Sequence, residues 1–383
     1  MITKFPDFDL SSRNTFRMRV RCGLFVEVSE EGDLEALDWD SLPRPVKVIG
    51  GGSNLLFTGD FPGTLIHYGG GTGLRGTSLS ALRFATAPPT VSFGVCDPLY
   101  PAGPSPCPCP GVDRPTEACP ATAPHVTLPA GVVFDEFCEW AAKSGLWGPE
   151  NLSLIPGEVG ASAVQNIGAY GVEAKDIITG IRAWDMQERR FVDIDPAECA
   201  YGYRASRFKT EWKDRFVITA VTFRLSSEPQ PRLDYGGLRK ALEGKGELTP
   251  ALIRQTIIDI RNSKLPRVEE LGSAGSFFCN PIVPRDVYER VLSIARSERG
   301  DDAVVPHFDL PEGVKIPAAW LIDTCGLKGA VQGGAAVYRN QPLVIVNASG
   351  EATPDDILAL ERHVIDTVRS KYGITLHPEV EHI

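Results

Sequence analysis

Short apolar runs between glycine-rich and proline-rich segments predict several β-strands. Residues 46–49 form an apolar run that enters the glycine-rich stretch 50–54, and residues 216–223 are dense in β-branched and aromatic side chains. Residues 181–194 predict two strands around a polar turn, and residues 374–376 predict a closing strand. The first of these strands leads directly into a glycine loop.

Apolar side chains recur at helical spacing in three ranges. The apolar residues of the range 133–141 fall on one helical face. A second helix is predicted to begin at Thr249-Pro250, where threonine suits the N-cap and proline the first turn, and to end before Leu265-Pro266. A third helix is predicted from Thr353-Pro354 to Gly373, because glycine favours the conformation that closes a helix.

Composition excludes some classes of protein. The chain has 383 residues, of which 43% are hydrophobic and 23% charged, so we expect two or three globular domains. No stretch has the length and apolarity of a membrane span, and the N-terminal residues lack the pattern of a signal peptide, which predicts a cytoplasmic protein. A net charge of −10 argues against broad nucleic-acid binding, so any phosphate site must be local.

One segment fits no regular element. Residues 94–125 contain nine prolines, which leave few backbone donors, and we interpret them as a surface insertion. The nine cysteines of the chain are expected to be free thiols. Cys107 and Cys109 could bind a metal, but zinc thiolates usually have wider spacing and a second pair, so we predict an irregular loop without metal.

Two glycine loops are candidates for a cofactor site. Backbone N–H groups of the stretch 50–54 can turn toward a pyrophosphate, although a glycine run after a strand is as often a plain tight turn. In the stretch 155–171, small residues leave room for a flat ligand, and Ser162, Gln165 and Asn166 offer hydrogen bonds. The alternative for this second loop is ordinary tight packing. Together the loops indicate a cofactor with buried phosphates and a large ring.

Seven blocks along nearly the whole chain resemble, in order, the UDP-N-acetylenolpyruvoylglucosamine reductase family. The residues outside this resemblance are mainly the insertion. The blocks are Asn14-Thr15-Phe16, Gly50-Gly51-Gly52-Ser53-Asn54, Leu154-Ile155-Pro156-Gly157, Gln165-Asn166-Ile167-Gly168-Ala169-Tyr170-Gly171, Tyr201-Gly202-Tyr203-Arg204-Ala205-Ser206, Gly275-Ser276-Phe277-Phe278-Cys279-Asn280-Pro281 and Pro378-Glu379-Val380.

The resemblance implies an α+β protein with an FAD-binding fold of the vanillyl-alcohol-oxidase (PCMH) type. Its two FAD-binding subdomains would span residues 1–64 and 65–266, with the insertion inside the second. A separate α+β substrate-binding domain would follow at 267–372, and residues 373–383 would form a strand that returns to the active site.

The resemblance also implies an activity. NADPH would reduce the bound FAD, and the flavin would then reduce the enolpyruvyl ether of UDP-N-acetylglucosamine to UDP-N-acetylmuramate. This oxidoreductase step belongs to peptidoglycan synthesis, and so to cell-wall biogenesis, cell shape and cell division. The expected partners are small molecules, with no nucleic acid, no membrane and a monomeric state.

Three residues matched by the resemblance suit the chemistry of hydride addition. Arg204 would stabilise the enolate-like intermediate, Ser276 would protonate the carbon next to the carboxylate, and Glu379 would polarise that group or relay the proton. Each has a plainer interpretation: a solvated ion-pair partner for Arg204, a turn for Ser276 and an exposed terminal carboxylate for Glu379.

The resemblance assigns binding residues with similar logic. Tyr235 resembles the residue of the subgroup that has a substrate-covering tyrosine loop. Cys279 stands where the family often has a basic residue, and we expect its thiol to take no part in the chemistry. The predicted FAD contacts are Gly50, Gly51, Gly52, Ser53, Asn54, Pro156, Gly157, Gly160, Ser162, Gln165, Asn166 and Gly168. The predicted substrate contacts are Tyr170, Tyr235, Lys264, Asn280, Lys328 and Gln341.

Two alternatives remain at this point. One is an FAD-dependent oxidase or dehydrogenase of the same superfold that acts on another carbohydrate or alcohol. A covalent flavin link, common in that group, would need a histidine or cysteine near the first loops, and His67 is the only early histidine. The other is a flavoprotein without activity that binds a partner through its insertion, against which the joint presence of Arg204, Ser276 and Glu379 argues.

Overall fold

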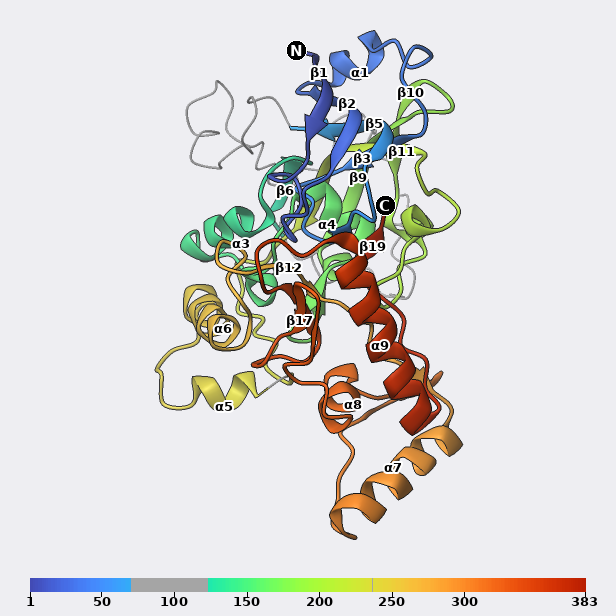
Figure 1. Ribbon diagram of the computed structural model, residues 1–383. Coiled ribbons are helices and arrows are strands. Elements are labelled where there is room, and N and C mark those ends of the chain that lie inside the picture. Colours follow the sequence, from blue (N-terminus) through green and yellow to red (C-terminus); the bar gives the residue numbers. More distant parts are fainter. Residues whose placement is uncertain (70–122, 236) are drawn as a thin grey trace. The chain divides into compact units, whose positions relative to one another are not determined.

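The computed structural model describes residues 1–69, 123–235 and 237–383 (Figure 1). The predicted insertion, up to residue 122, and its cysteines lie outside the described residues. The chain divides into a terminal unit, made of Met1–Tyr68 and Ile258–Ile383, and a central unit, Gly69–Ile257. The domain boundaries expected from the sequence stay predictions.

The first part of the terminal unit is a four-stranded sheet. Its order is β1-β2-β5-β3, in which β1 and β2 are antiparallel while β5 runs parallel to both β2 and β3. The strand predicted at residues 46–49 is thereby confirmed as β3. The elements here are β1 (Thr3–Asp9), β2 (Arg21–Val28), α1 (Glu31–Ala36), β3 (Val46–Ile49), β4 (Leu55–Leu56) and β5 (Phe61–Tyr68).

The later part of the terminal unit combines two antiparallel sheets with three helices. The sheets have the orders β12-β18-β17-β16 and β13-β15-β14, and apolar faces of α7, α8 and α9 supply much of the buried core. The strands are β12 (Gly272–Ser276), β13 (Ile282–Val283), β14 (Phe308–Leu310), β15 (Gly313–Lys315), β16 (Val331–Gln332), β17 (Ala335–Val337), β18 (Val344–Asn347) and β19 (Glu381–His382). The helices are α7 (Arg285–Arg299), α8 (Ala318–Thr324) and α9 (Pro354–Tyr372).

The central unit is built on an antiparallel sheet of order β10-β9-β11-β6. The strands predicted at 216–223 and within 181–194 are confirmed as β11 and the β9-β10 pair. A small hairpin, β7-β8, follows α4. The elements are β6 (His125–Pro129), α3 (Phe134–Lys143), α4 (Val159–Gln165), β7 (Gly168–Ala169), β8 (Val172–Glu173), β9 (Ile178–Asp185), β10 (Arg190–Ile194), β11 (Phe216–Arg224), α5 (Leu238–Leu242) and α6 (Pro250–Lys264), and the boundary between the units falls within α6.

The three predicted helices are confirmed as α3, α6 and α9. Thr353 caps α9 by accepting a hydrogen bond from the Asp356 amide, and Gly373 closes it with φ of +70°. At α6, the hydroxyl of Thr249 accepts from the Leu252 amide at 3.1 Å. Local capping chemistry therefore fixes the helix ends at the predicted residues.

The strand predicted at residues 374–376 is wrong. Ile374 and Leu376 are buried while Thr375 is exposed, which is the alternation that suggested a strand. Among the described residues, no strand pairs with 374–376, and pairing begins later, at a bridge between Pro378 and Phe278 and then in β19. Alternating burial shows an extended segment packed on a core, whether or not a neighbouring strand is present.

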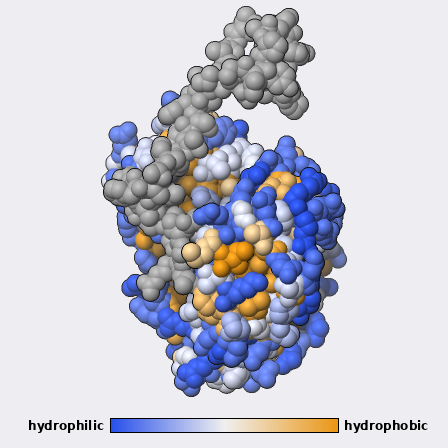
Figure 2. All heavy atoms as spheres, turned by 90° about the horizontal axis from the view of Figure 1, so that it is seen from above, coloured by the Kyte–Doolittle hydropathy of each residue, from blue (hydrophilic) through white to orange (hydrophobic). Residues whose placement is uncertain are grey.

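Hydrophobic residues are interspersed among hydrophilic ones on the face drawn in Figure 2. Within the ranges 1–69, 123–235 and 237–383, no helix combines the length and the apolar character needed to cross a membrane. No disulfide bond joins any of the five cysteines in these ranges to another.

Candidate functional site

The first glycine loop is fixed by main-chain contacts within the terminal unit. Gly52 has φ of +70°, and a Cβ atom there would overlap the carbonyl oxygen of Arg13, so this position requires glycine. The Thr15 amide donates to the Gly52 carbonyl at 3.2 Å. Gly51 is exposed. One glycine of the run therefore packs against protein, while its neighbour offers accessible main chain.

The Asn14-Thr15-Phe16 block joins this loop to β12. The Ser273 amide donates to the Thr15 carbonyl at 2.9 Å, and the Asn347 side chain donates to the Phe16 carbonyl at 3.0 Å. A Cβ atom at Gly272 would overlap that same carbonyl, so glycine allows the close approach. A main-chain hydrogen bond therefore joins the Asn14-Thr15-Phe16 block to β12, the strand that enters the block beginning at Gly275.

β12 ends at Ser276, whose side chain is exposed, whereas Phe277 and Phe278 after it are fully buried. The Glu379 amide donates to the Phe277 carbonyl at 2.8 Å. Asn54 in the glycine loop donates from its side chain to the Glu379 carbonyl at 3.1 Å. The terminal unit thus brings together Ser276, Glu379 and the first glycine loop, which the sequence places far apart.

The second glycine loop, in the central unit, packs closely on residues 130–134. A Cβ atom at Gly160 would lie 2.7 Å from the Cβ atom of Ala130, and the Gly160 amide donates to the Ala130 carbonyl at 2.8 Å. The Ser162 hydroxyl is buried and donates to the Val159 carbonyl at 2.6 Å. At position 160 the lack of a side chain therefore permits close packing, as in the plainer of the two interpretations of this loop. Pro156 is exposed and Gly157 half-buried, and Gly157 has φ of +118°.

Asn166 is fully buried at the end of α4, in the left-handed conformation with φ of +48°. Its Nδ2 atom donates to the Glu173 carboxylate at 2.9 Å and to the Gly202 carbonyl at 2.8 Å, and its Oδ1 atom accepts from the Lys175 amide at 3.0 Å. Both amide hydrogens are therefore used inside the protein. Asn166 holds the start of the β7-β8 hairpin against the segment that carries Arg204.

Arg204 contacts this hairpin directly. Its Nη2 atom donates to the Gly168 carbonyl at 2.6 Å, and a Cβ atom at Gly168 would lie 2.9 Å from its Nη1 atom. Arg204 has φ of +54°, a conformation that L-residues rarely adopt. Lys209 donates to the Arg204 carbonyl at 3.1 Å and to the Gln165 side chain at 2.9 Å. The guanidinium group therefore has a main-chain partner in the hairpin.

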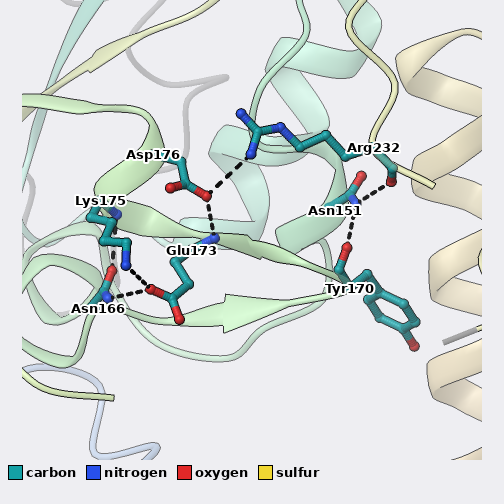
Figure 3. A network of polar contacts seen from close by, with 7 residues as sticks. All are labelled: Asn151, Asn166, Tyr170, Glu173, Lys175, Asp176 and Arg232. Carbon is teal, nitrogen blue, oxygen red and sulfur yellow. Dashed lines mark hydrogen bonds and ion pairs between the residues drawn. The ribbon is translucent and has the colours of Figure 1, made fainter. Parts of the chain in front are cut away.

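The segments that carry the two predicted tyrosines meet in the central unit. Tyr170 and Gly171 form the turn of the β7-β8 hairpin, with φ of +48° and +79°. A Cβ atom at Gly171 would lie 3.3 Å from the Cβ atom of Tyr235. The side chain of Asn151 donates to the Tyr170 carbonyl at 2.9 Å and to the Arg232 carbonyl at 2.8 Å (Figure 3).

The remaining predicted substrate residues belong to the terminal unit. Lys264 ends α6 and Lys328 follows α8, and both are exposed. Asn280 is half-buried, and its Oδ1 atom accepts from the Ala318 amide at the start of α8 at 2.9 Å. The Gln341 carbonyl accepts from the Val344 amide at 3.0 Å. Asn280 thus has a role in the fold besides any contact with a ligand.

Sequence reasoning missed three residues that organise the site. Asn151 joins two tyrosine-bearing segments, Glu173 accepts from Asn166, and Lys209 braces Gln165 and Arg204. Glu173 and Lys209 each lie within five residues of a recognised block, which is a usable signal. Asn151, in a short 3₁₀ helix, Glu150–Leu152, lies three residues before the block Leu154-Ile155-Pro156-Gly157, so the same signal applies to it. The partners of its side chain lie far along the chain and are set by tertiary structure.

The residues present fit a flavin nucleotide. Gly50 and Gly51 leave the first loop free of side chains, and Ser53 and Asn54 stay partly accessible beside them. In the central unit, Gly157 and Gly168 likewise keep accessible main chain. Among the described residues, no group of three or more histidine, cysteine or acidic side chains is arranged to hold a metal ion.

Comparisons with known proteins agree with this arrangement. The family model for the C-terminal domain of UDP-N-acetylenolpyruvoylglucosamine reductase matches residues 266–383, and the model of an FAD binding domain matches residues 120–191. The crystal structure of UDP-N-acetylenolpyruvylglucosamine reductase from Thermus caldophilus is similar in fold, with a TM-score of 0.61 and 20% identity over 100% of this chain and 98% of that one. The predicted α+β class, an FAD-binding fold of PCMH type plus a separate C-terminal domain, is confirmed.

Sequence relatives cover almost the full length. A UDP-N-acetylenolpyruvoylglucosamine reductase of Bacteroides fragilis (strain YCH46) is 39% identical over 98% of this chain and 99% of its own length. Relatives of the same name are 37% identical in Porphyromonas gingivalis (strain ATCC BAA-308 / W83), over 98% of both chains, and 38% identical in Chromobacterium violaceum, over 97% of both.

Proposed function

Because the chain belongs to the UDP-N-acetylenolpyruvoylglucosamine reductase family, we propose that Arg204, Ser276 and Glu379 carry its chemistry. The protein is an FAD-dependent oxidoreductase that uses NADPH to reduce the enolpyruvyl ether of UDP-N-acetylglucosamine, a step of peptidoglycan synthesis. The observation that carries this conclusion is the 39% identity over 98% of the chain.

The FAD, when bound, supplies the hydride to the terminal carbon of the enol ether. Negative charge then develops on the neighbouring carbon and its carboxylate, and the Arg204 guanidinium stabilises that charge. The Ser276 hydroxyl donates a proton to this carbon, and Glu379 polarises the carboxylate or relays the proton. Two observations support a shared role of Ser276 and Glu379. Ser276 is exposed at the end of β12, and the Glu379 amide donates to the carbonyl of Phe277, the residue after Ser276.

The proposed FAD contacts are the residues of the two glycine loops. We assign the first loop, Gly50, Gly51, Gly52, Ser53 and Asn54, and the second, Pro156, Gly157, Gly160, Ser162, Gln165, Asn166 and Gly168, to the cofactor site. For Asn166, Gly160 and Gly52, the role is to shape the site, because these residues pack on or hydrogen-bond to other parts of the protein. Tyr170, Tyr235, Lys264, Asn280, Lys328 and Gln341 would contact the sugar nucleotide, with the tyrosines on the base and the lysines on the diphosphate.

The cellular setting is part of the same proposal. Since the product is a precursor of the cell wall, the enzyme would work in the cytoplasm as a monomer and support cell shape and division. Its subdomains would follow the boundaries 1–64, 65–266, 267–372 and 373–383.

The alternative, an oxidase of the same superfold, has less support. His67, the early histidine considered for a covalent flavin link, is buried, with its Nδ1 atom 3.2 Å from the Glu27 carboxylate and its ring stacked on Phe25. These contacts give His67 a structural role.

The test separates the two half-reactions. Purified protein should carry flavin, and Ser276→Ala should keep NADPH-driven flavin reduction while reoxidation by the sugar nucleotide slows by about a hundredfold or more. Stopped-flow absorbance of the flavin measures both rates. Equal loss of both half-reactions would assign Ser276 a structural role, and protein without flavin would contradict the whole proposal.

A further inference from the structure

The Asn151 side chain links two segments that carry tyrosines. It is fully buried, and its two amide hydrogens reach the carbonyls of Tyr170 at 2.9 Å and Arg232 at 2.8 Å (Figure 3). Its Oδ1 atom is buried without a hydrogen-bond partner. Leaving a buried acceptor unpaired is unfavourable, so the two donated hydrogen bonds must matter to the fold or to the site.

The two carbonyls belong to the parts that place Tyr170 and Tyr235. Positive φ at both Tyr170 and Gly171 defines a type I′ turn, the two-residue turn whose twist suits a hairpin. Arg232 precedes Tyr235 by three residues, and Tyr235 reaches the turn at Gly171, where a Cβ atom would lie 3.3 Å from its own Cβ atom. Asn151 therefore sets the spacing between the turn and the tyrosine segment.

A second contact steadies the same segment. The Arg232 guanidinium lies 3.6 Å from the Asp176 carboxylate, which also accepts from the Glu173 amide at 3.0 Å. This ion pair is half exposed, so it contributes little by itself. The buried hydrogen bonds of Asn151 are the stronger link.

We propose that Asn151 is a positioning residue for the sugar nucleotide, acting through Tyr235. This inference rests on the proposed function, in which Tyr235 covers the substrate. Tyr235 as a residue is 40% exposed, so part of its surface is accessible to a ligand. An amide suits the role because a single nitrogen donates two hydrogens, whereas a carboxylate would face both carbonyls without a proton.

The experiment compares Asn151→Ala with Ser153→Ala as a matched control. Ser153 is buried in the same turn, and its hydroxyl donates to the Glu150 carbonyl at 2.7 Å, within the turn, and not to either tyrosine segment. We expect Asn151→Ala to raise KM for the sugar nucleotide about tenfold with kcat changed less than about twofold, because uniform binding is lost. Ser153→Ala should leave both constants near wild type.

A double-mutant cycle tests the route of the effect. If Asn151 acts through Tyr235, Asn151→Ala should change KM by less than about twofold when Tyr235→Ala is already present. Effects that multiply, or an unchanged KM in Asn151→Ala, would overturn the inference. Asn151→Ser keeps one donor and replaces the alanine variant in the cycle if that variant does not fold.

Failure of this inference differs from failure of the proposed function. If wild type consumes no NADPH in response to the sugar nucleotide, the function is wrong. If wild type is active and the Asn151 variants follow wild type, only the positioning role is wrong.

Discussion

The catalytic candidate Arg204 depends on the absence of a side chain at Gly168. Its Nη2 atom donates to the Gly168 carbonyl, and its Nη1 atom would lie only 2.9 Å from a Cβ atom at that position, which is too close without a shift. A glycine in a family block can thus make room for an arginine that lies next to it in the fold, and need not contact the cofactor. Spacing alone could not reveal this, because 36 positions separate the two residues.

We expect Gly168→Ala to displace the guanidinium and slow flavin reoxidation by the sugar nucleotide about a hundredfold, since small misplacements of a catalytic group have large effects. The added methyl would also lie 2.9 Å from the Val172 carbonyl. Stopped-flow reoxidation of reduced enzyme measures the effect. Gly180→Ala is the matched control, because its Cβ atom would make only ordinary contacts at 3.7 Å. Wild-type reoxidation in Gly168→Ala would mean that the Gly168 contact does not position Arg204.

At the scale of elements, capping residues made the helices predictable, whereas the β7-β8 hairpin was not predicted. α9 begins and ends at the predicted residues because the hydrogen bonds of Thr353 and Gly373 are made to residues three or four positions away. The β7-β8 hairpin turns at Tyr170-Gly171, and tyrosine is rare at a left-handed position, so the residue types there do not predict a tight turn. Contacts from Asn151 and Asn166, made in the folded chain, hold that conformation.

Thr353→Ala should lower the free energy of unfolding by about 1 kcal/mol, the usual effect of losing an N-cap hydrogen bond. The lost bond is the one from the Asp356 amide, at 3.2 Å. Urea denaturation measures the difference. Thr367→Ala, on the same helix, is the control, because its hydroxyl only bonds back to the His363 carbonyl at 2.7 Å. Equal losses in both variants would show that the cap itself contributes nothing.

At the scale of the whole molecule, the sequence predicted fold class and family but not which blocks would meet. The order of blocks identified a flavoprotein, yet pairing of Ser273 with Thr15, or of Glu379 with Phe277, depends on tertiary structure. The catalytic candidates are also divided between the units, with Ser276 and Glu379 in one and Arg204 in the other. The order of the motifs identifies the family, whereas the contacts between motifs depend on how the hydrophobic core packs.

Each unit holds a buried carboxylate that makes stability depend on acid. Burial would raise the pKa of Glu27, but the hydrogen bond from His67 and the charge of Arg13 prevail and lower it below its ordinary value of 4.5. Burial would likewise raise the pKa of Asp185, but the hydrogen bond from Arg215, at 2.6 Å, outweighs this effect. The pKa of Asp185 therefore lies below its ordinary value of 3.8. A lowered pKa means that the unfolded chain binds protons first, so stability present above these values is lost as pH falls through them.

We therefore expect the urea midpoint to hold steady near pH 6 and to fall between about pH 4.5 and pH 3. Asp185→Asn should flatten part of this fall, because the amide does not titrate. Circular dichroism during urea titration at each pH gives the midpoint. A midpoint that rises on acidification would contradict the assignment of these two carboxylates.

The pairing of β19 with β4 has a consequence for biosynthesis. The Asn54 side chain bonds to a carbonyl that lies 325 positions later, and the carbonyl of Ile383 accepts from the Thr58 amide. On the ribosome, the first strands leave the exit tunnel long before the segment that completes their unit is translated. The central unit can fold while the chain is still growing, whereas the terminal unit cannot be completed until residues 379–383 have left the exit tunnel.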